Sequence, residues 1–178
     1  MVKNLDDVVT LTTPVHTDNR GYFAESWNKS WQQGIDLTVA QTNVCWSEHR
    51  NTLRGLHAQY GGADVAKLVR VIHGEILDVY VDARLDSETY GEWRATKLAN
   101  LGQAIYIPRG FYHGYVTLTD NVLVTYHQDS VHNSKLECGL NFQEAGELFW
   151  QCWNIDTTKL LVSDKDRAQP GWDKAVKF

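Results

Sequence analysis

Apolar and polar residues alternate most clearly in the middle of the chain. Val69 and Val71 share one face of a first run, residues 77–82 alternate in the same way, and His73-Gly74 separates the two runs. A period of two is typical of strands that bury one face. We therefore predict that these two runs form a hairpin with one apolar face.

Other β-type runs follow at short intervals along the chain. They cover residues 8–13, 37–45, 104–107, 115–118 and 122–126, and residues 17–21 have the composition of a turn. Helical spacing appears over residues 27–33, where Trp27 and Trp31 are four apart and Gly34 follows, so we expect one short helix there. Many short strands predict an all-β fold of the jelly-roll kind, a sandwich or barrel, with residues 1–178 as one domain.

Composition limits the partners of this domain. The 178 residues are 43% hydrophobic and 22% charged, which suits one globular core. The formal charge of -5, without a Lys/Arg-rich run, argues against a nucleic acid or an anionic membrane as the main partner. No apolar run reaches the roughly 18 residues of a membrane span. The scattered Cys45, Cys138 and Cys152 suggest neither disulfides nor a zinc cluster, and we expect a cytoplasmic protein.

Two kinds of residue stand out from this background. The aromatic segment 149–153 (FWQCW) is expected to pack in the core or in a dimer interface. Histidines are the second kind, and most lie in turn-like or polar surroundings where a solvated side chain is expected. These are His16, His49, His73, His127 and His132.

The remaining histidines, His57 and His113, are candidates for chemistry. Residues 108–113 (PRGFYH) resemble the second motif of cupin barrels, whose histidine usually helps to bind a metal. The first cupin motif normally supplies H-x-H, but this chain reads His57-Ala58-Gln59. Two histidines without a third strong ligand make a poor zinc or iron site. We therefore predict a cupin without metal or cofactor, in which His57 is free to act as a base.

A set of short motifs in a fixed order resembles the dTDP-4-dehydrorhamnose 3,5-epimerase family of sugar-nucleotide epimerases. The motifs are residues 18–26 (DNRGYFAES), 53–57 (LRGLH), 67–71 (KLVRV), 74–84 (GEILDVYVDAR), 107–114 (IPRGFYHG) and 161–166 (LVSDKD). The resemblance covers about residues 18–166. It implies an isomerase of deoxysugar and polysaccharide biosynthesis.

The resemblance also implies a mechanism. Family substrates are nucleotide-linked 4-keto-6-deoxy sugars, in which the carbon centres beside the ketone are inverted. By resemblance, His57 is the base, Asp166 holds its imidazole, Lys67 faces the enolate oxygen and Tyr126 returns a proton from the opposite side. Removal of a proton beside a ketone needs such a base, an oxyanion partner and a proton donor.

The same resemblance implies the residues that bind the substrate and a second subunit. Arg20 and Arg54 match phosphate-contacting arginines, although strict alternation places Arg54 on the face opposite His57 unless Gly55 allows a bulge. Other matched positions line the sugar or nucleotide site; they are Phe23, Glu25, Gln41, Asn43, Gln59 and His113. In this family the N-terminal strand commonly exchanges between subunits, which implies a homodimer in which Arg20 and Phe23 serve the partner's site.

Several points stay open at this level. After Tyr126 the family usually carries a pair of aromatic residues, one of which stacks on thymine, whereas this chain reads HQDSVH over residues 127–132. The nucleotide carrier is therefore open between dTDP, GDP and another nucleotide, and so are the exact sugar, its pathway and whether C3, C5 or both are inverted. The alternatives are a ketoisomerase of a 4-keto sugar nucleotide, a non-catalytic sugar-nucleotide-binding cupin, and a metal-dependent enzyme on the same fold.

Overall fold

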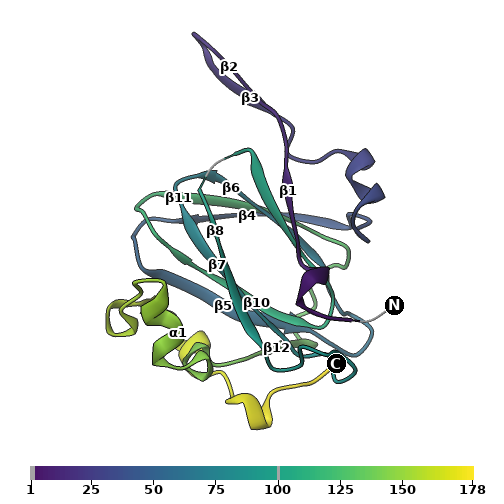
Figure 1. The fold of residues 1–178 in the computed structure, drawn as a ribbon, viewed down its shortest axis with the longest axis vertical. Helices are drawn as coiled ribbons and strands as arrows, with labels where there is room; N and C mark the ends of the chain where they lie inside the picture. Colours follow the sequence, from purple (N-terminus) through teal and green to yellow (C-terminus); the bar gives the residue numbers. More distant parts are fainter. Residues whose placement is uncertain (1–2, 100) are drawn as a thin grey trace.

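Two antiparallel sheets packed face to face form the body of the protein (Figure 1). The structure is a computed structural model that describes residues 3–99 and 101–178. The first sheet has the order β1 (Val9–Thr12), β9 (Gln103–Ile107), β6 (Lys67–His73), β11 (Val122–Gln128) and β4 (Gln41–Ser47). The second has the order β12 (Glu137–Gly139), β5 (Thr52–Gln59), β10 (Phe111–Thr117), β7 (Ile76–Asp82) and β8 (Trp93–Leu98). The all-β prediction is confirmed, and the sheets form a sandwich rather than a closed barrel.

Short elements complete the chain around this sandwich. A separate hairpin consists of β2 (Val15–Asp18) and β3 (Gly21–Ala24), and β13 (Leu161–Val162) runs parallel to β5. The α-helices are α1 (Glu147–Cys152) and α2 (Asp164–Arg167). The 3-10 helices are η1 (Leu5–Asp7), η2 (Lys29–Gln33), η3 (Phe142–Ala145), η4 (Thr157–Lys159) and η5 (Trp172–Lys174). The short helix expected over residues 27–33 is thus a single 3-10 segment that ends, as expected, at Gly34.

The hairpin predicted from the central alternation is wrong. β6 pairs with β9 and β11 in the first sheet, whereas β7 pairs with β8 and β10 in the second. The chain crosses between the sheets at Gly74, whose φ of +82° suits glycine and whose Cβ would lie 2.7 Å from Thr119 Oγ1. Alternation within a strand reports which residues share a face, but it does not report which strand lies beside it.

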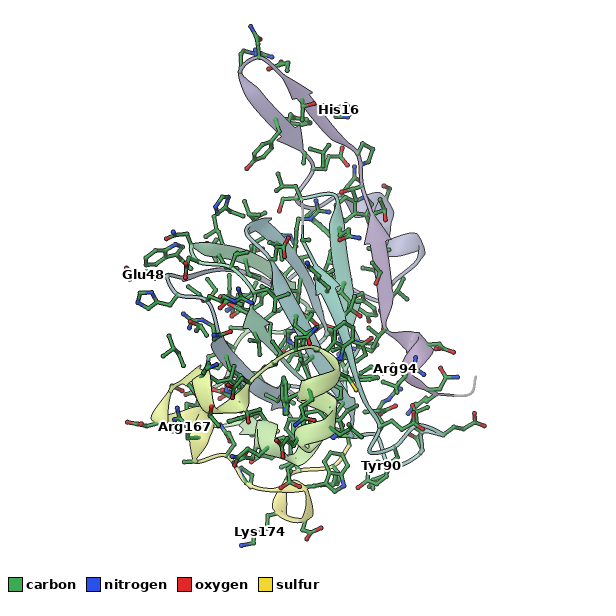
Figure 2. The ribbon with its side chains drawn as sticks, turned by 60° about the vertical axis from the view of Figure 1, so that its left-hand side comes forward. His16, Glu48, Tyr90, Arg94, Arg167 and Lys174 are labelled. Atoms are coloured by element: carbon green, nitrogen blue, oxygen red, sulfur yellow. The ribbon has the colours of Figure 1, made fainter. Side chains whose placement is uncertain are left out.

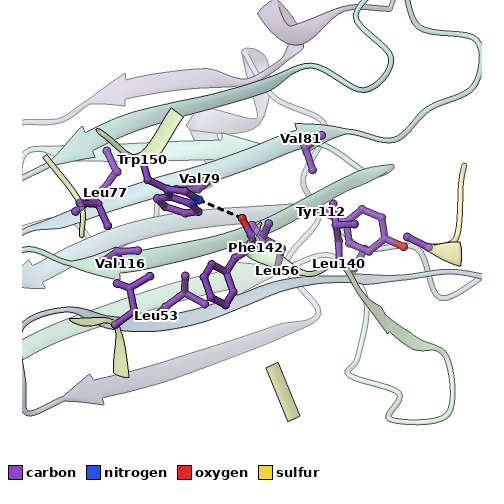
Figure 3. Packing of buried hydrophobic residues seen from close by; sticks show 14 of the residues in the cluster. Leu53, Leu56, Leu77, Val79, Val81, Tyr112, Val116, Leu140, Phe142 and Trp150 are labelled. Carbon is purple, nitrogen blue, oxygen red and sulfur yellow. Dashed lines mark hydrogen bonds between the residues drawn. The ribbon is translucent and has the colours of Figure 1, made fainter. Parts of the chain in front are cut away.

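Leu77, Val79 and Val81 of β7 share one apolar face, as expected, but the opposite face of this strand is buried as well. Every residue of β7 is buried, including the polar Asp78 and Asp82. Its inner face packs in the sandwich, and its outer face lies under the C-terminal segment (Figure 3). Trp150 of α1, which is 1% exposed, packs in this outer cluster and donates a hydrogen bond from Nε1 to the Phe142 carbonyl at 3.2 Å. The aromatic segment therefore packs the core through Trp150, as predicted.

The segment that contains η2 covers part of the outer face of the first sheet. His127 of β11 lies under this segment and is 5% exposed, with its ring nitrogens bonded to Thr42 Oγ1 at 2.9 Å and to the Ser26 carbonyl at 3.3 Å. Trp27 packs on its ring at 5.7 Å between centroids. The prediction of a solvated His127 is therefore wrong, because the covering segment lies 101 residues away in sequence and left no local signal.

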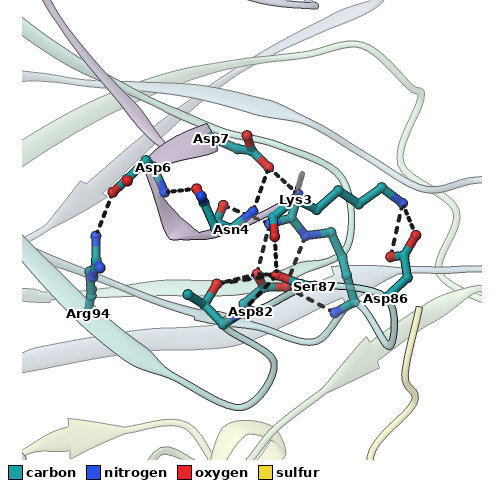
Figure 4. Close-up of polar contacts among 10 residues, drawn as sticks. Lys3, Asn4, Asp6, Asp7, Asp82, Asp86, Ser87 and Arg94 are labelled. Carbon is teal, nitrogen blue, oxygen red and sulfur yellow. Dashed lines mark hydrogen bonds and ion pairs between the residues drawn. The ribbon is translucent and has the colours of Figure 1, made fainter. Parts of the chain in front are cut away.

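Ion pairs hold the N-terminal segment against the end of the second sheet (Figure 4). Arg84 pairs with Asp82 at 2.7 Å and with Asp7 at 2.6 Å, and it also donates to the Asn4 carbonyl at 2.8 Å. This buried guanidinium anchors η1, from which β1 leads along the edge of the first sheet. The chain then leaves the body and forms the β2–β3 hairpin, which projects away from both sheets (Figures 1 and 2).

Candidate active site

A pocket of about 810 Å³ opens between the two sheets. Residues of β4, β6 and β11 line it from the first sheet, and residues of β5 and β10 line it from the second. Nine residues predicted for the site lie on its wall; they are Gln41, Asn43, Arg54, His57, Gln59, Lys67, His113, Tyr126 and Asp166. The pocket therefore gathers most of the residues that the sequence motifs had singled out.

His57 and Asp166 form a hydrogen-bonded pair at the wall of this pocket. His57 Nε2 lies 2.6 Å from Asp166 Oδ1, across a sequence separation of 109 residues. Ser163 caps the short helix α2 that carries Asp166, and the Gly55 N–H donates to the second carboxylate oxygen at 3.2 Å. Burial raises the pKa of Asp166, but the hydrogen bonds from His57, Gly55 and Ser163 outweigh it and leave the pKa below its ordinary value. A carboxylate that stays ionised in this position orients the imidazole and stabilises an imidazolium.

A bulge in β5 places Arg54 on the same side as His57. His57 is opposite His113 in β10, whereas Arg54 is opposite Tyr115, so β5 has one residue more than β10 in this interval. Gly55 lies in the bulge with φ of +119°, and its Cβ would be 2.7 Å from Gly114 Cα. Glycine is therefore required for this close approach. The bulge expected at Gly55 is present, and it explains how Arg54 and His57 can both line the pocket. The Arg54 guanidinium donates to Ser47 Oγ and to the Trp46 carbonyl, each at 3.0 Å.

Lys67 and Tyr126 reach the pocket from the first sheet, opposite the sheet that carries His57. Lys67 is half-buried on the pocket wall, and its Nζ donates to the His57 carbonyl at 3.4 Å. Burial lowers the pKa of Lys67 to about 8, although the charges of Asp78 and Glu137 partly oppose this shift. Burial also raises the pKa of Tyr126, so its phenol stays protonated. The pocket therefore has an imidazole on one sheet, a phenol on the other and a lysine amine that contacts the His57 backbone.

His113 forms a second pair with a carboxylate. Its Nε2 lies 2.9 Å from Asp78 Oδ2, and both side chains are almost closed to solvent. The other oxygen, Asp78 Oδ1, is buried and has no hydrogen-bond partner among the described residues. The negative charge of Asp78 acts on Lys67 and favours its ammonium form. Asp78 was not predicted as a site residue, because in the sequence it reads as the polar face of a strand.

The amides on the pocket wall form a connected network. Gln41 Nε2 donates to Asn43 Oδ1 at 2.8 Å, and Asn43 Nδ2 donates to Gln128 Oε1 at 2.6 Å. Gln59 uses both ends of its amide within the protein, donating to the Ala63 carbonyl at 2.9 Å and accepting from the Asn133 N–H at 2.6 Å. These contacts fix the amide orientations and hold the loops at the pocket mouth.

Glu137 is the main site residue that the sequence analysis missed. It lies opposite Gln59 in β12, and its carboxylate is 3.9 Å from His57 Nε2, 3.7 Å from His132 Nε2 and 2.8 Å from Lys165 Nζ. Burial raises the pKa of Glu137, but the Lys165 hydrogen bond and nearby cations outweigh it and lower the pKa. The strand that carries Glu137 has three residues and no clear alternation. Glu137 is therefore recognised as a site residue only from its contacts in the structure. Its partner Lys165 lies within the motif of residues 161–166, next to Asp166.

Arg20, Phe23 and Glu25 do not line this pocket. Arg20 is in the turn of the projecting hairpin, where its exposed guanidinium pairs with Asp18 at 2.6 Å. Phe23 is 67% exposed and stacks only loosely on His16, with 6.4 Å between ring centroids. Glu25 is exposed and accepts a hydrogen bond from Asn28 Nδ2 at 3.0 Å. Within this subunit, these predicted residues are separated from the rest of the site.

The described residues contain no group of three or more His, Cys, Asp or Glu side chains arranged to hold a metal ion. His57 and His113 each have one ring nitrogen bonded to a carboxylate, as described above. Among the helices of the described ranges, none has the length and apolar character needed to cross a membrane.

Comparisons with known proteins agree in family and fold. The sequence model of the family described as dTDP-4-dehydrorhamnose 3,5-epimerase matches residues 3–174. A protein of that name from Methanothermobacter thermautotrophicus is 36% identical over 168 residues, which cover 92% of this chain and 89% of that protein.

Two solved structures show the same similarity in three dimensions. One is the dTDP-4-dehydrorhamnose 3,5-epimerase of Bacillus anthracis with TDP and PPi bound; it is 32% identical, with a TM-score of 0.84 over 95% of this chain and 96% of that chain. The other is a 3'-monoepimerase from Streptomyces bikiniensis in complex with dTDP-quinovose; it is 29% identical, with a TM-score of 0.81 over 93% and 83%.

Proposed function

This chain belongs to the dTDP-4-dehydrorhamnose 3,5-epimerase family, and we propose that it inverts C3, C5 or both in a dTDP-linked 4-keto-6-deoxy sugar. It is an isomerase of the sugar-nucleotide epimerase class. The observation that carries the proposed residue roles is the His57–Asp166 pair facing Tyr126 across one pocket, with Lys67 beside them. The dTDP carrier is supported by the TDP and dTDP-quinovose bound in the two similar structures.

The proposed reaction begins with removal of the proton on a carbon beside the ketone. Nε2 of His57 is engaged by Asp166, which leaves Nδ1 as the ring nitrogen that accepts the proton. The electron pair of the broken C–H bond moves to the ketone oxygen, and the Lys67 ammonium stabilises the resulting enolate. Tyr126 then donates its phenolic proton to the opposite face of the same carbon, which inverts the centre. Proton exchange with solvent restores His57 and Tyr126.

We assign substrate binding to the polar groups around this reaction centre. Arg54 is the cation of the pocket for the diphosphate, because a planar guanidinium can hold two phosphate oxygens. Asn43 and Gln41 offer amide groups along the first sheet, and Glu137 with Lys165 offers an acceptor and a donor at the mouth. His113 lines the pocket beside His57 and is oriented by Asp78.

The projecting hairpin supports a homodimer with exchanged N-terminal strands. Its Tyr22 and Phe23 side chains are 57% and 67% exposed in this subunit. Exposed aromatic residues of this kind commonly lie in interfaces. The edge strand β4 also exposes Val44 and Trp46, at 71% and 54%, on the outer side of the first sheet. We propose that the hairpin of one subunit packs on the other and brings Arg20, Phe23 and Glu25 to the partner's pocket. The cytoplasm is the proposed location, since Cys45, Cys138 and Cys152 are free thiols.

Solvent-deuterium incorporation tests the proposed reaction. The protein is incubated in D₂O with 4-keto-6-deoxy sugars linked to dTDP or GDP, with and without a chelator, and NMR follows the positions beside the ketone. We expect chelator-insensitive exchange with the dTDP sugar, and the labelled position identifies C3, C5 or both. Absence of exchange with either carrier would contradict the epimerase proposal, and exchange only with GDP would contradict the carrier.

A further inference from the structure

Among residues 3–99 and 101–178, one tyrosine hydroxyl on the pocket wall stands out because it makes no hydrogen bond of normal geometry. Tyr115 of β10 is 6% exposed and lines the pocket, yet its hydroxyl makes no hydrogen bond of normal geometry to any described residue. The Cys45 thiol and the Ser47 hydroxyl are its nearest polar neighbours; burial and Cys45 raise the pKa of Tyr115, whereas Ser47 lowers it. A phenylalanine would fill the same space without burying an unpaired hydroxyl.

The other buried tyrosines of the described chain show that this is unusual for the molecule. The Tyr106 hydroxyl donates to the Asp36 carbonyl at 2.9 Å, and the Tyr112 hydroxyl donates to the Val176 carbonyl at 2.9 Å. The hydroxyl of Tyr80, which packs in the same cluster as Tyr115, lies 3.3 Å from Thr96 Oγ1. The buried tyrosine hydroxyls that lie away from the pocket thus each have a hydrogen-bond partner.

Tyr115 lies beside the proposed phosphate site, next to the strand pair that carries the proposed reaction centre. Its backbone is paired with Arg54, and two residues earlier in β10 His113 is paired with His57. The Tyr115 and Tyr126 side chains also have Cys45 and Arg54 as common electrostatic neighbours. A sugar with its reacting carbon beside His57 and its diphosphate at Arg54 would therefore have its linkage end near Tyr115.

The part of the substrate near Tyr115 is defined by its chemistry. In a 4-keto hexose linked through C1, C2 carries a hydroxyl group and lies between the diphosphate linkage and C3, one of the two centres beside the ketone. Resting on the proposed function, we propose that the Tyr115 hydroxyl binds this 2-hydroxyl and selects sugar nucleotides that retain it over 2-deoxy sugars. The Tyr115 hydroxyl is closed to solvent, so the contact forms after a small shift of the ring or through one ordered water molecule.

The test compares two substrates and three proteins. Wild type, Tyr115→Phe and the control Tyr80→Phe are assayed for deuterium exchange on the dTDP-linked 4-keto-6-deoxy hexose and on its 2-deoxy counterpart. We expect Tyr115→Phe to lower kcat/KM about tenfold for the 2-hydroxyl sugar and to leave the 2-deoxy sugar nearly unchanged. Binding of dTDP alone and the thermal unfolding temperature should not fall. Tyr80→Phe removes a paired hydroxyl outside the pocket and should leave the preference between the sugars as in wild type.

Failure of the proposed function and failure of the Tyr115 inference give different results in this test. If wild type exchanges neither sugar, the proposed function is contradicted and this inference falls with it. If wild type is active and Tyr115→Phe leaves both rates unchanged or lowers both equally, only the role of Tyr115 is overturned. A loss of dTDP binding in Tyr115→Phe would likewise overturn it, because the contact would then be to the nucleotide.

Discussion

Raising the pH from 7 to 9 should remove most of the activity by deprotonating Lys67. Burial lowers the pKa of Lys67 to about 8, from an ordinary value of 10.5, while the charges of Asp78, Glu137 and Cys138 oppose the shift. With that pKa, about 90% of Lys67 is charged at pH 7 and about 10% at pH 9. If only the ammonium stabilises the enolate, kcat/KM should fall about ninefold over this range and about tenfold per pH unit above it.

Two substitutions separate Lys67 from other titrating groups. Lys67→Arg keeps a charge throughout this range, so the decline near pH 8 should disappear even if the less compact guanidinium lowers the rate at pH 7. Lys67→Met removes the charge and should lower kcat by about 10² to 10³ at every pH. The raised pKa of Tyr126 places its own deprotonation above the ordinary value of 10.0, outside the range of the experiment.

The assay is the initial rate of deuterium incorporation between pH 6 and 10, with circular dichroism at each pH to verify that the protein stays folded. Constant wild-type activity between pH 7 and 9.5 would refute the reasoning. So would an unchanged decline near pH 8 in Lys67→Arg, since another group would then be responsible.

Further predictions concern the carboxylate partner of the base, the acid, the close approach of β5 and β10, and metals. Asp166→Asn should lower kcat by about 10² to 10⁴, because the amide donates to His57 Nε2 and holds the wrong tautomer; a wild-type initial rate would show that the pair is dispensable. Tyr126→Phe should slow product formation by about 10² to 10⁴ while retaining exchange at the first centre, and equal loss of both would make Tyr126 structural. Gly114→Ala should reduce the free energy of unfolding by about 1–3 kcal/mol, because its Cβ would lie 2.5 Å from a backbone carbonyl of β5; an unchanged denaturant midpoint would contradict this. A chelator should leave the exchange rate unchanged, and loss restored by one added metal would contradict the metal-free reaction.

Local sequence determined the elements and most of the candidate site. Alternation and β-type composition located β1, β4, β6, β7, β9, β10 and β11 to within a few residues, because a strand between solvent and core must present one type of residue to each side, but β8 was not predicted. The ordered motifs selected the residues that line the pocket, including Lys67, which by itself reads as a surface lysine. The glycine at position 55 also indicated, correctly, that β5 departs from strict alternation at this point.

The arrangement of these elements in space was decided by tertiary structure alone. The sequence does not reveal that β6 and β7 lie in different sheets, that a covering segment buries His127, or that Glu137 approaches His57. Each depends on hydrogen bonds and packing between segments far apart in the chain, which periodicity within one segment does not record. The His57–Asp166 pair spans 109 residues, and the unpaired Tyr115 hydroxyl is recognised only once all its neighbours are in place. The sequence thus supplied the chemical groups, and the packing of two sheets decided which of them meet.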